Sequence, residues 1–312
     1  MTLTIKRRLI NRIILITTIV FILISVIIFM TRHVSSTSLN MGKAEMYVRN
    51  LAPMKEFYVD LVGLEILKED SNELELGFKN KGIITLIKKT GFNSENQNEA
   101  GLYHNAILFE SRSTLAESIN RVLNKLSINY QGSADHLVSE AFYFADPEGN
   151  GVELYFDKPR SDWQFDQNGK PVMGGIYIDE QKYIQDNISS DNTPSNIEMG
   201  HIHLKVGNIQ TAKQFYVDIL KFDIIRQTAD SLFISRDGYH HHIGMNTWQS
   251  LGAGKRRENV YGLYSFELKV NSSYFNEIKE SLKLNNQETT KTSPSSIEVL
   301  DPWGNVVKIN TI

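Results

Sequence analysis

An internal repeat constrains the fold of this chain more than any other feature. The stretch KEFYVDLVGLEIL at residues 55–67 returns as KQFYVDILKFDII at 213–225. The stretch DPEGNGVEL at 146–154 returns as DPWGNVVKI at 301–309. Self-similarity of this kind indicates one supersecondary unit that is used more than once. The chain is therefore two copies of one plan.

Each copy contains the same order of elements twice. A short strand comes first (44–48 or 201–206), then an amphipathic helix with Phe and Tyr at its centre, then short strands of alternating or β-branched residues. A glycine-led strand, in GLYHNAILFE at 101–110 or GLYSFELKV at 262–270, restarts the order. The pattern predicts an α+β fold of four βαβββ modules in two pairs.

Length and composition indicate two folded domains. A chain of 312 residues can bury two cores of ordinary size. We expect modules one and two in a domain at 41–158, and modules three and four in a domain at 199–312. The segment 159–198 is rich in Asp, Asn, Ser and Gly and is expected to link them.

Residues 1–40 are expected to form an anchor and a spacer. The uncharged stretch at 13–30 is just long enough to cross a bilayer as a helix, and basic residues precede it. The positive-inside rule then holds the N-terminus in the cytoplasm, which gives a single-pass protein of the cell membrane. Translation that starts at Met30 or Met41 is the alternative, and it would give a cytoplasmic protein.

Charge and cysteine content exclude several functions. The formal net charge is −3, and the basic residues are scattered, so we expect no nucleic-acid partner. The chain has no cysteine, which excludes thiolate nucleophiles and zinc-thiolate sites. Histidine, aspartate and glutamate are left as candidate metal ligands.

Together these motifs resemble the vicinal oxygen chelate superfamily, and within it the catechol 2,3-dioxygenase type of extradiol ring-cleaving enzymes. The stretches that carry the resemblance are FYVDILKFDI, GLYHNAIL, DPEGNGVELYFDKPRS, GHIHLKV and GYHHHIGMN. It covers residues 42–312 and implies a glyoxalase-like fold whose paired modules surround a cavity. It also implies Fe(II)-dependent cleavage of a catechol by dioxygen, with Mn(II) as the alternative metal. A glyoxalase-like isomerase or lyase and a metal-free small-molecule binding protein are the alternative functions.

The resemblance assigns the metal ligands to His104, Glu153 and His201. The equivalent positions in modules one and four carry lysine or serine, so only modules two and three retain the set. Two imidazoles and one carboxylate leave open positions for a catechol and dioxygen. His203 is the alternative to His201, because residues two apart on a strand share a face.

These ligands can meet only if module two pairs with module three. Modules one and four would then form the other, metal-free pair. Sequential pairing, of one with two and three with four, would divide the ligands between two cavities. We therefore expect the crossed pairing, and we leave homo-oligomerisation open.

Three consecutive histidines, His240, His241 and His242, lie in a run that the pattern interprets as a strand. Neighbours on a strand face opposite sides, so they cannot all serve one centre. The resemblance places a proton-transferring histidine here, and we predict His242 as this acid/base residue. His240 and His241 are expected to be surface or packing residues.

The resemblance also implies catalytic roles for His136 and Tyr143. Both precede Glu153 at the places where the family positions a histidine and a tyrosine beside the bound catechol. Hydrogen bonds from these side chains would stabilise negative charge that develops on the substrate.

Overall fold

The computed structural model describes residues 37–125, 129–189 and 194–312. Residues Leu39–Ile312 form one compact unit. The expected membrane anchor at 13–30 lies outside the described residues. Within the described segments, no helix is both long and apolar enough to cross a membrane.

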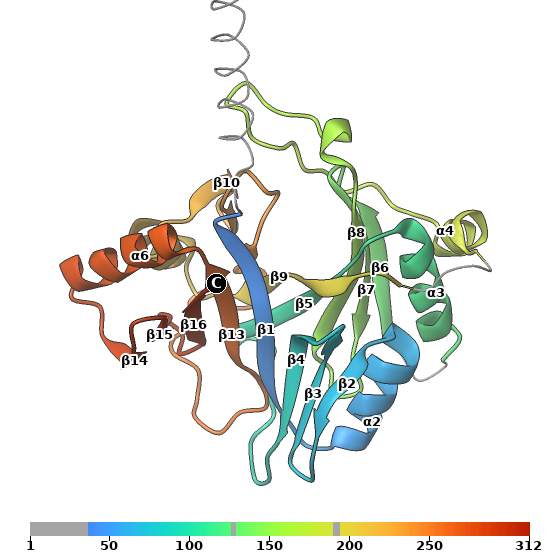
Figure 1. Ribbon diagram of the computed structural model, residues 1–312, viewed down its shortest axis with the longest axis horizontal. Helices are drawn as coiled ribbons and strands as arrows, with labels where there is room; N and C mark the ends of the chain where they lie inside the picture. Colours follow the sequence, from blue (N-terminus) through green and yellow to red (C-terminus); the bar gives the residue numbers. More distant parts are fainter. Residues whose placement is uncertain (1–36, 126–128, 190–193) are drawn as a thin grey trace, which may run out of the picture. The chain divides into compact units, whose positions relative to one another are not determined.

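Four βαβββ modules follow one another along the chain, as the repeat predicts (Figure 1). Module one consists of β1 (Leu39–Val48), α2 (Leu51–Lys55) with its π-helical continuation η1 (Glu56–Val62), β2 (Glu65–Glu69), β3 (Glu73–Phe78) and β4 (Lys81–Lys88). Module two consists of β5 (Gly101–Phe109), α3 (Arg112–Leu123), β6 (Asn129–Asp135), β7 (Ser139–Ala145) and β8 (Gly151–Asp157).

The second half of the chain repeats this order after a connection that holds η2 (Arg160–Asp162) and α4 (Glu180–Asn187). Module three consists of β9 (Ile197–Lys205), α5 (Ile209–Lys213) with its continuation η3 (Gln214–Ile219), β10 (Asp223–Gln227), β11 (Ser231–Ser235) and β12 (Ile243–Asn246). Module four consists of β13 (Gly262–Val270), α6 (Ser272–Leu284), β14 (Thr289–Thr292), β15 (Ser296–Leu300) and β16 (Val306–Thr311).

The two repeated motifs hydrogen-bond to each other in both halves of the chain. The Tyr58 hydroxyl in η1 donates to Asp146 in the turn before β8, at 3.2 Å. The Tyr216 hydroxyl in η3 donates to Asp301 in the turn before β16, at 2.9 Å. All four side chains are buried. A buried hydroxyl and carboxylate need such partners, which explains why the FY and DPxGN motifs recur together.

The modules pair crosswise into two eight-stranded sheets (Figure 1). One sheet has the strand order β14-β15-β16-β13-β1-β4-β3-β2, and the other has the order β10-β11-β12-β9-β5-β8-β7-β6. The central contacts are antiparallel, between β1 and β13 and between β5 and β9. Module two therefore pairs with module three, which confirms the crossed arrangement and excludes the sequential one.

Strand register in the second sheet brings three polar positions to one face. Ala106 on β5 lies opposite His201 on β9 and beside Glu153 on β8. His104 lies two residues before Ala106 and so shares its face. The methyl group of Ala106 is small, so the longer side chains around it can converge.

Candidate metal centre and its cavity

The side chains of His104, Glu153 and His201 meet at this face. One potential ligand atom from each residue lies within 4.8 Å of the other two. The Oε2 atom of Glu153 is 2.9 Å from Nε2 of His104 and 3.2 Å from Nε2 of His201. All three side chains are buried. Strands from two modules therefore assemble a group that neither module contains alone.

The electrostatics of this group suit cation binding. Burial alone would raise the pKa of Glu153, but the neighbouring His201 and His104 hold that pKa well below its ordinary value. Burial lowers the pKa of His201. An ionised carboxylate beside neutral imidazole is the protonation state that a metal ion requires of its ligands.

The donor set fits a divalent transition metal. Two imidazole nitrogens and one carboxylate oxygen, with open positions, are the donors of non-haem Fe(II) sites. Among the described residues, the buried Nε2 of His104 makes no aligned hydrogen bond. A buried ring nitrogen without such a partner is costly, and a metal ion would satisfy it.

His203, the alternative ligand, is turned to another partner. Its Nε2 accepts a hydrogen bond from Nδ2 of Asn246, at 3.0 Å. Burial, followed by the neighbouring His104 and His201, lowers the pKa of His203 well below its ordinary value. The structure thus brings His201, and not His203, into the group of three.

The histidine triplet does not lie on a strand. Strand β11 ends at Ser235 and β12 begins at Ile243, so residues 240–242 form part of the turn between them. The Nδ1 atom of His242 accepts from the backbone N–H of Arg236, at 3.2 Å, and burial lowers the pKa of His242 to about 3. The strand position expected for His242 is therefore wrong, because strand alternation does not apply to a turn, and His241 rather than His242 lines the cavity. The acid/base role of His242 stays a prediction.

His241 takes the place that was expected for His242. Its side chain lines the cavity, and its ring centroid is 4.1 Å from that of His201. Burial and the surrounding histidines lower the pKa of His241 well below its ordinary value. His240 is fully buried, and its two ring nitrogens contact Asp157 and His241.

His136 and Tyr143 lie together on the cavity wall. The Nδ1–H of His136 donates to the carbonyl of Gly174 at 2.7 Å, so its Nε2 accepts from the Tyr143 hydroxyl at 2.6 Å. Burial and the nearby Glu153 raise the pKa of Tyr143 well above its ordinary value. Tyr143 is thus a neutral phenol.

The cavity has a volume of about 900 Å³, at the upper end of the range for small-molecule sites. His104 and Glu153 lie in its wall. An aromatic side of the cavity is formed by Tyr103, His203, Phe233 and Trp248. An aromatic ring held at the centre would therefore contact other rings.

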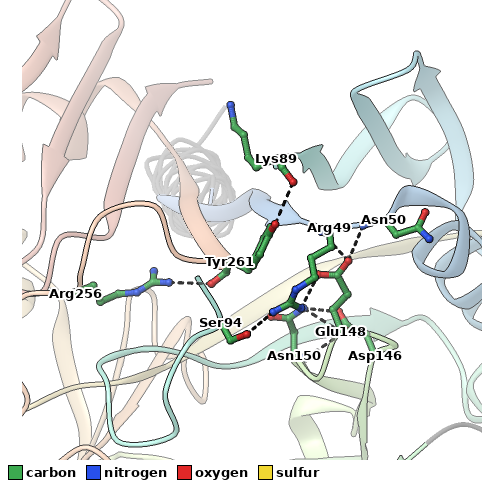
Figure 2. Close-up of polar contacts among 9 residues, drawn as sticks. All are labelled: Arg49, Asn50, Lys89, Ser94, Asp146, Glu148, Asn150, Arg256 and Tyr261. Atoms are coloured by element: carbon green, nitrogen blue, oxygen red, sulfur yellow. Dashed lines mark hydrogen bonds and ion pairs between the residues drawn. The ribbon is translucent and has the colours of Figure 1, made fainter. Parts of the chain in front are cut away.

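Polar residues from both sequence halves line part of this cavity, and Figure 2 shows the contacts among them. Arg49, directly after β1, donates to Glu148 at 3.4 Å and to Ser94 Oγ at 2.7 Å. Its guanidinium lies 4.3 Å from the centroid of the Tyr261 ring, and the Tyr261 hydroxyl donates to the carbonyl of Lys89 at 3.2 Å. Connections that are distant in the chain therefore meet at this part of the cavity lining.

Sequence reasoning missed the charged wall of the cavity. Lys205 follows His201 and His203 at alternate positions of β9, so strand periodicity could have placed it on the same face. Its Nζ pairs with Glu95 at 3.0 Å. Glu95 lies in the connection between β4 and β5, where no periodic signal exists.

The equivalent place in the other sheet holds an ion pair. Glu45 on β1 accepts from Ser265 at 2.7 Å and from Lys308 at 2.5 Å. In the repeat, Glu45, Ser265 and Lys308 are equivalent to His203, His104 and Glu153, respectively. A lysine ammonium thus supplies positive charge where the second sheet offers metal ligands.

Comparison with known proteins agrees with this geometry. No protein-family model matches the chain. A protein of Bacillus subtilis (strain 168) named catechol-2,3-dioxygenase is 36% identical over 231 residues, which is 72% of this chain and 80% of that protein. Glyoxalase I from Zea mays shares the fold with a TM-score of 0.53 at 14% identity, over 88% of this chain and 92% of its own. The cppA protein of Streptococcus pneumoniae does so with a TM-score of 0.54 at 13% identity, over 88% and 100%.

Paired βαβββ modules around a buried group of two histidines and one glutamate define the vicinal oxygen chelate class of proteins. The 36% identity to the Bacillus protein identifies the family within this class to which the chain belongs. The chain belongs to the catechol 2,3-dioxygenase type within the vicinal oxygen chelate superfamily, and it is a dioxygenase-like enzyme.

Proposed function

We propose that this protein is an Fe(II)-dependent extradiol dioxygenase that cleaves the aromatic ring of a catechol with dioxygen. The observation that carries the proposal is the convergence of His104, Glu153 and His201 beside a cavity with an aromatic side. The name of the Bacillus subtilis relative, catechol-2,3-dioxygenase, supports a catechol as the substrate.

In this proposal His104, Glu153 and His201 hold the metal, with Mn(II) as the alternative to Fe(II). A bound Fe(II) supplies Lewis acidity toward the catechol hydroxyls and open positions for substrate and dioxygen. The rings of Phe233 and Trp248 contact the substrate ring and exclude water from one side of it.

In this proposal His241 is the proton acceptor, in place of His242, to which the resemblance gave that role. Its pKa is low, so the ring is neutral and has a lone pair for the proton of a substrate hydroxyl. The hydroxyl of Tyr143 also lines the cavity; its proton is donated to His136, so its oxygen accepts a hydrogen bond from a substrate hydroxyl and orients it.

The donor set argues against the glyoxalase-like alternative. Within the described segments, the group that could hold a metal contains one carboxylate, whereas glyoxalase-like isomerisation generally draws two acidic ligands. Retention of a complete donor set likewise argues against a metal-free binding protein. The fold shared with maize glyoxalase I carries no information on the reaction.

The proposal is tested by loading purified protein with Fe(II) under anaerobic conditions and then adding catechol and oxygenated buffer. We expect the yellow ring-opened semialdehyde to form, with one dioxygen consumed per catechol. A parallel assay offers the hemithioacetal of methylglyoxal and a thiol. If the protein isomerises that compound and consumes no oxygen with any catechol tested, the glyoxalase-like assignment replaces the dioxygenase assignment.

A further inference from the structure

A chain of hydrogen bonds leads from the cavity to a carboxylate on the far side of the histidine triplet. The Nδ1 atoms of His240 and His241 lie 2.8 Å apart. On the other side of its ring, Nε2 of His240 lies 2.8 Å from Oδ1 of Asp157, at the end of β8. The side chain of Asp157 is about one quarter exposed, whereas His240 is fully buried.

For uncharged imidazole rings, the chemistry of these groups sets the direction of each hydrogen bond. A carboxylate only accepts, so Nε2 of His240 carries the hydrogen. In a neutral imidazole the other nitrogen is then an acceptor, so Nδ1 of His240 accepts from Nδ1–H of His241. Nε2 of His241 is left with a free lone pair. Among the described residues, none hydrogen-bonds to this atom, and the His241 side chain lines the cavity.

Other contacts hold the first two members of this chain in place. The second oxygen of Asp157 accepts from the Tyr239 hydroxyl at 2.8 Å. The ring of Tyr239 lies 4.0 Å from that of His240, and the ring of Trp163 lies 5.6 Å from it, between centroids. With its ring enclosed and both nitrogens engaged, His240 has one orientation available. The hydrogen bond between the two Nδ1 atoms then fixes the orientation of His241 relative to His240.

We propose that Asp157 and His240 are positioning residues that hold His241 as the Nδ1–H tautomer, with the lone pair of Nε2 available to a hydroxyl group of the substrate. The arrangement is a carboxylate–imidazole–imidazole relay in which only the last ring meets the substrate. The inference rests on the proposed function for its consequence in turnover, but its statement about the tautomer stands on geometry alone. It also explains why three adjacent histidines are used: His242 closes the turn, His240 orients and His241 acts.

The tautomer is tested directly by nitrogen NMR of protein labelled with ¹⁵N-histidine and loaded with Zn(II), which is diamagnetic. Signals are assigned by their loss in His240→Gln and His241→Gln. In the wild-type protein we expect a protonated Nδ1 and an unprotonated Nε2 for His241. A His241 ring protonated at Nε2, or one that averages between both tautomers, overturns the proposal, and this measurement requires no variant to be active.

The consequence for turnover is tested with Asp157→Asn, which keeps the shape of the side chain but can present its amide N–H to His240. With the Fe(II) content equal to that of the wild type, we expect kcat to fall about tenfold or more while KM for catechol changes less than about threefold. Asp157→Glu should recover part of kcat. Asp223→Asn, which removes a carboxylate near Arg236 outside the relay, is the matched control and should leave kcat unchanged.

These experiments distinguish failure of the positioning role from failure of the proposed dioxygenase function. Equal kcat in Asp157→Asn and the wild type refutes the positioning role, even with an active dioxygenase. Wild-type protein that cleaves no catechol refutes the proposed function, and the tautomer of His241 in the NMR experiment then still decides the geometric inference.

Discussion

The hydroxyl group of Tyr155 lies directly against the backbone of Gly200, where a Cβ atom would come within 1.7 Å of the Tyr155 oxygen. Gly200 immediately precedes the candidate ligand His201, and Tyr155 lies two residues after the candidate ligand Glu153. The Tyr155 hydroxyl also hydrogen-bonds to Tyr239 at 2.9 Å. β5 lies between β8 and β9 in the sheet, so the Tyr155 side chain reaches across β5, and the missing side chain of Gly200 leaves room for its hydroxyl beside the metal centre.

Gly200→Ala should displace Tyr155 and the backbone next to His201. We expect the free energy of unfolding to fall by about 1–3 kcal/mol, as in other overpacked cores, and the affinity for Fe(II) to fall with it. Urea denaturation and metal titration measure the two effects. Gly175→Ala, where a Cβ would meet no atom within 4 Å, is the control. Equal behaviour of both variants would contradict a tight contact at Gly200.

His104→Ala should abolish metal binding and ring cleavage together. The variant lacks one of three donors, so we expect the dissociation constant for Fe(II) to rise at least about a hundredfold. Metal analysis after dialysis gives the answer. Ser265→Ala changes the twin position in the other sheet and should keep its metal. Full metal content in His104→Ala would remove this residue from the centre.

Substitution of His241 and of His242 should have different effects on turnover. His241→Asn should retain its metal and lose about a hundredfold in kcat, because it lacks the proton acceptor. His242→Asn should keep kcat within about threefold, because its Nδ1 contacts Arg236 and Ser235 and not the cavity. Steady-state kinetics on both variants decide this. The opposite order of effects would restore the role that the sequence assigned to His242.

His242 should also make the protein sensitive to acid. Its pKa of about 3 in the folded state lies below the ordinary value near 6.5, so between these values the unfolded chain binds a proton that the folded chain does not. The stability conferred by the neutral ring is therefore present above pH 6.5 and is lost as the pH falls. Between pH 6.5 and pH 5, we expect the free energy of unfolding of the wild type to fall by about 2 kcal/mol more than that of His242→Asn. Denaturant titrations at both pH values measure the difference, and parallel curves would contradict it.

We propose that the stretch at 13–30, outside the described residues, anchors the protein in the cell membrane. Native protein should then sediment with washed membranes and be released by detergent but not by high salt. Protein that begins at Met30 or Met41 should remain in the supernatant. Recovery of the full-length native chain in the soluble fraction would refute the anchor.

The repeat made most of the fold accessible from sequence. Four βαβββ modules and their crossed pairing follow from the repeated motifs and from the division of His104, Glu153 and His201 between modules two and three. The resemblance to the family was sufficient to assign the ligands there, and each ligand lies on a strand. Strand periodicity failed at His241 and His242, where a turn replaces the expected strand.

Loop residues could not be placed from sequence for a different reason. Glu95 and Arg49 reach the cavity rim through contacts between segments that are distant in the chain. No pattern of spacing encodes such contacts. Their position depends on how the two sheets pack, which is known only once the whole unit has folded.

The crossed pairing also sets the order in which a growing chain can fold. β1 emerges from the ribosome early, yet its neighbour β13 is made only after modules two and three. The hydrogen bond between Ser265 and Glu45 therefore joins residues that are 220 positions apart in the chain. The inner pair of modules is complete first and can close before the outer pair has its second member. Contacts of such long separation close slowly, so the outer sheet should be the late step of folding and the part of the chain that most needs protection during synthesis.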